Sequence, residues 1–197
     1  MGLIPVAPGD LATVVTTLEM RERPLPRPMP PSPLRLMRWR STEPERYRAL
    51  FRQVGQRWLW YSRLVLDDAA LTAKLASPAA EIHVAVDSRG VEVGMIELDF
   101  ALPEVALLTY LALVPELTGR GHGRWLIAHA LAIGWRPGIA RMTLDTCTLD
   151  HPSALGSYRA QGFVATRRTV EVFPDPRARG LLPPDCAPQI PYLASRR

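Results

Sequence analysis

A glycine-rich turn between Thr118 and Arg124 carries the strongest chemical signal in this chain. It places Gly119, Gly121 and Gly123 at alternate positions, after an apolar segment and before an amphipathic one. Glycines let a backbone approach a ligand closely, and the first N–H groups of a helix are unpaired and carry a partial positive charge. The spacing therefore predicts an anion-binding cradle, suited to a phosphate or pyrophosphate.

Several phosphate-binding folds use such a turn, and the residues that follow it distinguish them. A nucleoside-triphosphate loop needs Lys and then Ser or Thr after its last glycine, where this chain has Arg124 and Trp125. A dinucleotide-binding turn needs a third glycine at the position of Arg124, although Asp145, at the end of a later strand, could bind a ribose. The sequence therefore disfavours the first kind of site and leaves the second open as an alternative.

A second segment, residues 150–163, has the pattern of a short helix. Pro152 suits its first turn, Ala154 and Tyr158 share one face, and Gly162 ends it. Together with the glycine turn, this segment resembles the GNAT superfamily of acetyl-coenzyme A-dependent N-acetyltransferases. The family pattern is Arg/Gln-x-x-Gly-x-Gly/Ala and, later, Asn-x-x-Ala-x-x-x-Tyr with a following Gly-Phe.

The resemblance covers residues 82–172, with two departures. Thr118 stands where the family usually has Arg or Gln, and His151 stands where it usually has Asn. Both usual residues mainly stabilise the loop and the helix start around the cofactor. The backbone donors of the cradle are therefore expected to remain.

The resemblance implies an α/β fold with a mixed, mostly antiparallel central sheet that is flanked by helices. Its fourth and fifth strands, here residues 105–114 and 141–146, would splay apart, and the pantetheine arm of acetyl-coenzyme A would insert between them. Backbone groups of Ala112 and Val114 would contact the arm, while N–H groups of the glycine turn would hold the pyrophosphate. The residues that the resemblance assigns to this co-substrate are Ala112, Val114, Thr118, Gly119, Arg120, Gly121, His122, Gly123, Arg124, His151 and Tyr158.

Transfer to an amine requires a free amine and a proton for the departing thiolate. Alkyl amines have a pKa near roughly 10, so a base or a water chain must remove a proton at neutral pH. The resemblance gives the role of general acid to the Tyr158 hydroxyl. For the base, Glu97, which shares a strand face with Asp99, ranks first, and a water bound by Tyr110 ranks second. The alternative for both carboxylates is a solvated sheet face.

Three aromatic residues, Trp58, Trp60 and Tyr61, fall where the variable helices of the family cover the acceptor. They cannot all face the core of one helix. We expect them to bind the acceptor, and a core cluster or a contact in a homodimer is the alternative.

The resemblance therefore implies an N-acetyltransferase that moves an acetyl group from acetyl-coenzyme A directly to a primary amine, without a metal. A transferase of longer acyl groups is one alternative, and a coenzyme A-binding regulatory or structural protein without turnover is another. The sequence does not distinguish a small-molecule amine from a protein amine.

Composition excludes several other classes of protein. The 197 residues are 47% hydrophobic, and 24 Lys and Arg residues exceed 19 Asp and Glu residues by five, without a long basic block that would predict nucleic-acid binding. Cys147 and Cys186 have no partners at metal-ligand spacing and predict no disulfide framework. No leader and no apolar run of membrane-spanning length is present, so we expect a cytoplasmic protein.

The elements that must position these residues follow from periodicity. We expect an N-terminal strand and proline-rich connector in residues 1–33, the acetyltransferase-like domain in 34–174, and a Pro- and Arg-rich tail in 175–197 that is surface-draped or partly ordered. Strands are expected at 11–20, 34–39, 81–86, 91–101, 105–114, 141–146 and 163–173, and helices at 43–54, 67–75 and 121–135, besides the short helix of Tyr158.

Overall fold

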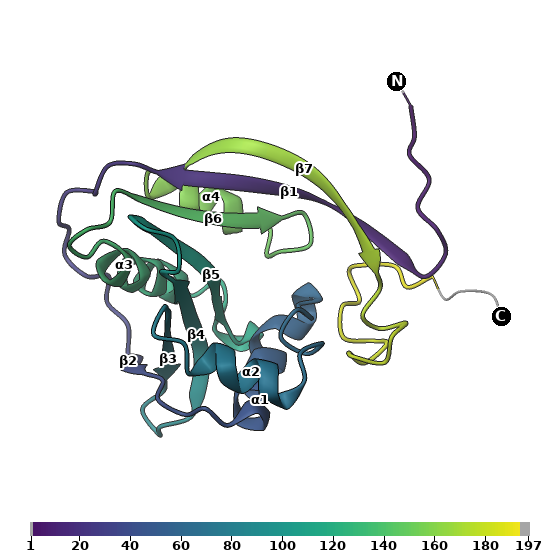
Figure 1. Cartoon of the computed structure of the whole chain (residues 1–197), viewed down its shortest axis with the longest axis horizontal. Helices are drawn as coiled ribbons and strands as arrows, with labels where there is room; N and C mark the ends of the chain where they lie inside the picture. The colour runs from purple at the N-terminus through teal and green to yellow at the C-terminus, as the bar shows by residue number, and fades with distance from the viewer. Residues whose placement is uncertain (1, 194–197) are drawn as a thin grey trace.

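The computed structural model describes residues 2–193, and within them a seven-stranded sheet forms the centre of the molecule (Figure 1). The strand order is β2-β3-β4-β5-β6-β1-β7, and neighbours are antiparallel except β5 and β6. The strands are β1 (Asp10–Met20), β2 (Arg35–Arg38), β3 (Ala80–Val86), β4 (Glu92–Asp99), β5 (Val105–Leu113), β6 (Arg141–Cys147) and β7 (Val164–Pro174). The predicted mixed, mostly antiparallel sheet is confirmed.

Helices pack against both sides of β4 and β5. In Figure 1, α3 lies to one side of these strands, and α1 and α2 lie to the other. The helices are α1 (Pro44–Gly55), α2 (Asp68–Leu75), α3 (His122–Gly134) and α4 (Ala154–Ala160), with short 3-10 turns at η1 (Gln56–Trp58) and η2 (Pro115–Leu117). Asp67 caps α2 by accepting from the Ala70 N–H, as its acidic start predicts, whereas α1 begins after Glu43 without a side-chain cap.

The N-terminal strand β1 is an integral part of the sheet, because it lies between β6 and β7 (Figure 1). Its residues Val15–Met20 pair with β6, and Asp10–Glu19 pair with β7. The proline-rich segment that follows has no helix or strand, and its residues 23–30 lie along α3. Strands β6 and β7, which precede and follow α4 in the chain, do not pair with each other, because the N-terminal strand β1 lies between them.

Strands β5 and β6 pair over only part of their length. The parallel register runs from Val105 with Arg141 to Leu108 with Leu144, although β5 continues to Leu113. At the point of separation, the register between β4 and β5 shifts and leaves Thr109 as an extra residue. Such a bulge bends a strand and leaves backbone groups unpaired. The predicted splay between the fourth and fifth core strands is therefore present.

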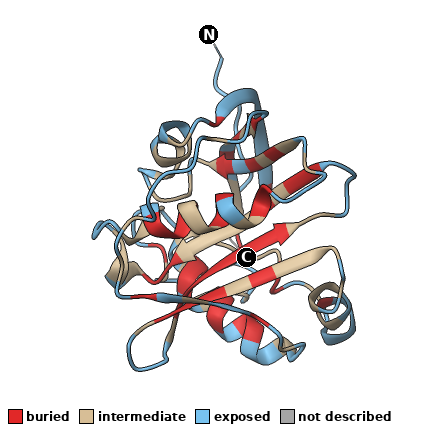
Figure 2. Ribbon diagram, turned by 90° about the vertical axis from the view of Figure 1, so that its left-hand side faces the viewer, coloured by how far each residue is buried: buried red, intermediate tan, exposed pale blue. Residues whose placement is uncertain are grey.

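The core fills the space between the sheet and the inner faces of the helices (Figure 2). Tyr47 and Phe51 of α1, Leu126 of α3, and Met95 and Ile96 of β4 have almost no exposed surface. This packing fixes α1 and α3 against the strands that separate, so the gap between β5 and β6 has rigid walls.

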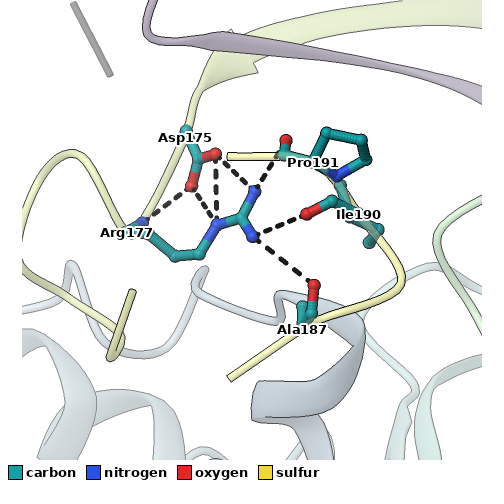
Figure 3. Close-up of polar contacts among 5 residues, drawn as sticks. All are labelled: Asp175, Arg177, Ala187, Ile190 and Pro191. Atoms are coloured by element: carbon teal, nitrogen blue, oxygen red, sulfur yellow. Dashed lines mark hydrogen bonds and ion pairs between the residues drawn. The ribbon is translucent and has the colours of Figure 1, made fainter. Parts of the chain in front are cut away.

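The C-terminal segment, for which a surface-draped or partly ordered tail is predicted, has a buried ion pair. Its Arg177 is 5% exposed and donates both to the Asp175 carboxylate and to the carbonyls of Ala187, Ile190 and Pro191 (Figure 3). A buried arginine with these acceptors folds the segment onto itself. The arrangement could not be read from the composition, and residues 194–197 lie outside the described residues.

Candidate active site

A cavity of about 200 Å³ follows the separated part of β5, from the glycine turn at one end to a group of aromatic side chains at the other. Residues 108–113 of β5 form one wall, and residues of α3 and α4 form others. We call the glycine-turn end, lined by Thr118, Gly119 and Gly123, the cradle end. We call the end lined by Trp58, Trp60, Tyr110 and Asp150 the aromatic end.

The cradle end is made of backbone. Gly119 and Gly121 have φ of 73° and 87°, the left-handed region that favours glycine, and Gly121 directly precedes α3. A Cβ added at Gly123 would meet no atom within 4 Å, so space remains at the helix start for a ligand. The Arg124 N–H donates to the Gly121 carbonyl, and the N–H groups of His122 and Gly123, at the start of α3, can donate to an anion there.

The other residues predicted for the cradle lie beside the cavity. Arg120, Gly121 and Arg124 are exposed and do not line it. His122 does not line it either, and its Nδ1 lies 3.1 Å from the Ser32 hydroxyl. That contact ties the proline-rich segment to the start of α3.

Of the two residues predicted to contact a pantetheine arm, one lines the cavity and the other does not. Ala112 lines the cavity, whereas Val114 does not. The Val114 N–H donates to the Val93 carbonyl, and the Val114 carbonyl accepts from the Leu117 N–H. Val114 therefore serves the turn that follows β5.

Tyr158 lines the cavity from α4, as its register predicted. His151 helps to position this helix, because its Nδ1 accepts from the Ser153 N–H at 3.2 Å and lies 2.8 Å from the Ser153 hydroxyl. Histidine thus supports the helix start where the family pattern has Asn. Burial raises the pKa of the Tyr158 hydroxyl, and the charge of Asp150 raises it further, so the hydroxyl keeps its proton.

At the aromatic end, Trp58, Trp60 and Tyr110 line the cavity. The Trp60 and Tyr110 rings are 4.8 Å apart, and burial is the main cause that raises the pKa of the Tyr110 hydroxyl. That hydroxyl is hydrogen-bonded to Ser62. Tyr61 differs from the prediction, because it stacks on Phe173 at 5.3 Å and does not line the cavity.

Glu97 does not line the cavity, contrary to the expectation that it points toward an acceptor. Its side chain is buried, accepts from the Tyr47 hydroxyl, and forms an ion pair with Arg63. Asp99 lies at the end of β4, 3.8 Å from Lys74. Glu97 therefore supports α1 and the segment after η1, and it is not placed to receive a proton from a ligand in the cavity.

The sequence reasoning missed a carboxylate that does line the cavity, Asp150. Its Oδ2 accepts from the Thr146 hydroxyl at 2.8 Å and from the Cys147 N–H at 2.9 Å, and its Oδ1 lies 3.3 Å from Trp60 Nε1. Its position directly before His151 in the helix pattern was the available signal. No sequence pattern indicated Thr109, the bulge residue, which lines the cavity and has a buried hydroxyl without a hydrogen-bond partner among residues 2–193.

This architecture matches that of a known protein family. A family model described as the acetyltransferase (GNAT) family matches residues 20–163. The chain belongs to this family. The predicted resemblance is confirmed.

Solved structures support the fold of this GNAT protein. A GCN5-related N-acetyltransferase from Sphaerobacter thermophilus is 17% identical, with a TM-score of 0.59, and the match covers 85% of this chain and 52% of that one. A GCN5-related N-acetyltransferase from Kribbella flavida is 16% identical, with a TM-score of 0.55, and the match covers 85% of this chain and 60% of that one. An aminoglycoside acetyltransferase from an uncultured soil metagenomic sample is 18% identical, with a TM-score of 0.56, and the match covers 71% of this chain and 93% of that one. The chain thus spans about half the length of the Sphaerobacter protein, and no curated protein sequence matches it.

The described part of this GNAT protein has neither a group of metal ligands nor a membrane-spanning helix. No group of three His, Cys, Asp or Glu side chains between residues 2 and 193 could hold a metal ion. In the same part of the chain, no helix is long and apolar enough to cross a membrane.

Proposed function

We propose that this GNAT protein transfers an acetyl group from acetyl-coenzyme A to a primary amine. The observation that carries the proposal is that one cavity joins the backbone cradle, the unpaired edge of β5 and the Tyr158 side chain. A pyrophosphate would lie at the start of α3, a pantetheine arm along residues 109–112, and a thioester near Tyr158. The aromatic end then remains for the acceptor.

The residues fit coenzyme A by their chemistry. The cradle offers N–H donors and an open position at Gly123, which suits a pyrophosphate. The separated part of β5 offers main-chain groups to an extended, amide-containing arm, in the manner of strand addition. The buried Thr109 hydroxyl lacks a partner within the described residues, and a polar ligand in the cavity would supply one.

In the proposed reaction, the amine nitrogen attacks the thioester carbonyl carbon, an N–C bond forms, and the C–S bond breaks. The departing thiolate takes a proton from the Tyr158 hydroxyl, which is neutral at pH 7 as any tyrosine is. An acceptor that arrives as an ammonium first gives one proton to water, because only the neutral nitrogen has a lone pair for the attack. The nitrogen loses one further proton as it becomes an amide, and that proton replaces the one given to sulfur. The products are an N-acetylated amine and coenzyme A.

Two alternatives remain within the same cavity. A longer acyl group is one, and coenzyme A binding without turnover is the other. The second is favoured by one observation: Glu97, the first candidate for the base, is paired with Arg63 away from the cavity.

Calorimetry with acetyl-coenzyme A, coenzyme A and NAD, followed by thiol release across a panel of amines, tests the proposal. We expect acetyl-coenzyme A to bind, NAD not to bind, and thiol release to depend on an added amine. Binding without amine-dependent release would support the protein without turnover. Faster release from a longer acyl-coenzyme A would support the other alternative, and a preference for NAD would reject the cradle assignment.

A further inference from the structure

The charge of the cavity differs in sign from that of the protein. The chain carries a formal net charge of +5. Yet the residues that line the cavity, within the described part of the chain, include the carboxylates Asp145 and Asp150 and no Lys or Arg. A ligand in the cavity therefore meets negative side-chain charge inside a basic protein.

Asp150 is the carboxylate at the aromatic end. Its three hydrogen-bond donors are the Thr146 hydroxyl, the Cys147 N–H and, more weakly, the Trp60 indole N–H. All three are uncharged, so they hold the carboxylate in place without neutralising it. Asp150 and Tyr158 line the same cavity, so the carboxylate lies on the wall that also carries the proposed general acid.

The aromatic rings around Asp150 favour the same kind of ligand. Trp58 and Trp60 line the cavity beside it, and Tyr110 packs on Trp60 at 4.8 Å. The faces of such rings attract cations, most strongly for Trp. The guanidinium groups of Arg63 and Arg57 already lie over the Tyr110 and Trp58 rings, at 4.9 Å and 5.9 Å from their centroids, so a ligand cation would meet the remaining ring faces. Their apolar surface also suits the carbon stem of an amine.

We propose that the acceptor binds as a cation, with its ammonium group at the Asp150 carboxylate and its apolar stem among Trp58, Trp60 and Tyr110. This rests on the proposed function and narrows it to one class of acceptor: a primary ammonium without a neighbouring carboxylate. A free amino acid is disfavoured, because its α-carboxylate would meet Asp150, and the basic side chain that lines the cavity there is the histidine His151, with no Lys or Arg among the described lining residues.

Direct binding to the coenzyme A-loaded protein tests this class independently of turnover. The probes are phenethylamine, its neutral isostere 2-phenylethanol, and phenylalanine, together with the pair butane-1,4-diamine and butane-1,4-diol. By calorimetry, we expect each ammonium probe to bind at least about tenfold more tightly than its partner without net positive charge, because charge-assisted hydrogen bonds are the strong ones. Because this comparison uses the unaltered protein, it does not depend on how a variant folds.

The variant Asp150→Asn keeps an oxygen for the Cys147 N–H and removes the charge. We expect it to lose the preference for ammonium probes by about tenfold, whereas Asp99→Asn, the same change on a residue outside the cavity wall, should keep it. A preference that survives in folded Asp150→Asn protein would overturn the assignment to Asp150. Equal binding of charged and neutral probes in the unaltered protein would overturn the cationic acceptor.

Different results would reject the proposed function and the ammonium site. Charge-selective binding without any release of thiol from acetyl-coenzyme A would reject acetyl transfer and leave the ammonium site standing. Release that is equally fast with alcohols as with amines would support acyl transfer and reject the ammonium site.

Discussion

The two ends of the cavity differ in how the chain builds them. The cradle end comes from one continuous stretch, from Thr118 to Gly123, of which Thr118, Gly119 and Gly123 line the cavity. The aromatic end brings together side chains from η1, the residues after it, β5 and the loop before α4. A backbone site follows from local glycines and one helix start, whereas a site made of converging side chains depends on the packing of the whole molecule. Changes at the two ends should therefore have separable effects.

Tyr158 stands where the two ends meet, and its loss should have the largest effect. Tyr158→Phe keeps the ring beside Phe163 but removes the proton for the thiolate, which typically costs about 10² to 10⁴ in rate. The loss should appear in kcat and in kcat/KM alike, while acetyl-coenzyme A affinity changes little. Stopped-flow thiol release and calorimetry measure the two quantities.

The pH dependence sharpens this test. Because the pKa of Tyr158 is raised, the hydroxyl keeps its proton above the ordinary tyrosine pKa of about 10, so the unaltered enzyme should not lose activity between about pH 9 and 11 through this group, as it would with an unshifted tyrosine. A Tyr158→Phe enzyme with full kcat, or one whose loss is explained by unfolding, would reject the role of general acid.

Arg177 tests whether the aromatic end depends on distant packing. Arg177→Ala leaves the Asp175 carboxylate, 2% exposed, without its partner, and breaking a buried pair costs about 3–5 kcal/mol. Because Gln189 in the same segment donates to the Arg57 carbonyl, next to Trp58, the acceptor KM should rise more than the Kd for coenzyme A. Denaturant unfolding and steady-state kinetics measure both.

Arg179 provides the matched control for that experiment, because it is exposed in the same segment. Arg179→Ala should change the free energy of unfolding by less than about 0.5 kcal/mol. Equal stability of the two variants would contradict the structural role of the Asp175–Arg177 pair.

Gly123→Val breaks the cradle end alone. The new side chain enters the open space where a pyrophosphate would approach, and we expect coenzyme A binding to weaken at least about tenfold, or roughly 1.4 kcal/mol. Gly156→Val is the control, since it is also helical, also has nothing within 4 Å of an added Cβ, and lies outside the cavity wall. Calorimetry that finds both variants equal to the unaltered protein would refute the cradle.

Trp58→Ala should break the aromatic end alone, with the smallest effect. Loss of a cation–π contact of about 0.5–1 kcal/mol would raise the acceptor KM roughly two- to fivefold and leave coenzyme A affinity unchanged. Tyr61→Ala removes a neighbouring aromatic side chain that stacks on Phe173 outside the cavity, so the acceptor KM should stay constant. The opposite result would restore the original expectation for Tyr61.

The features that the sequence predicted correctly are local ones, and the features that it did not predict depend on contacts between distant segments. The boundaries of β6 and α3 were predicted within one residue, and Gly119, Gly123 and Tyr158 line one cavity, because periodicity, glycines and helix register are local signals. The roles assigned to these residues stay predictions. The Thr109 bulge, the partners of Glu97 and the buried Arg177 arise from contacts between segments far apart in the sequence, for which no local pattern exists.

The position of β1 has a consequence for the order in which the molecule can fold. Strands β2 to β5 are neighbours in sequence and in space, so they can pair as soon as each is synthesised. Strand β1 emerges first but must wait for its partners, because Thr17 pairs with Asp145 and with Arg167. Contacts of such long sequence separation form slowly, since the chain between them must first be brought together. The last step of folding should therefore be the insertion of the earliest strand, and a chain shortened to begin at Arg21 would leave β6 and β7 with no strand between them.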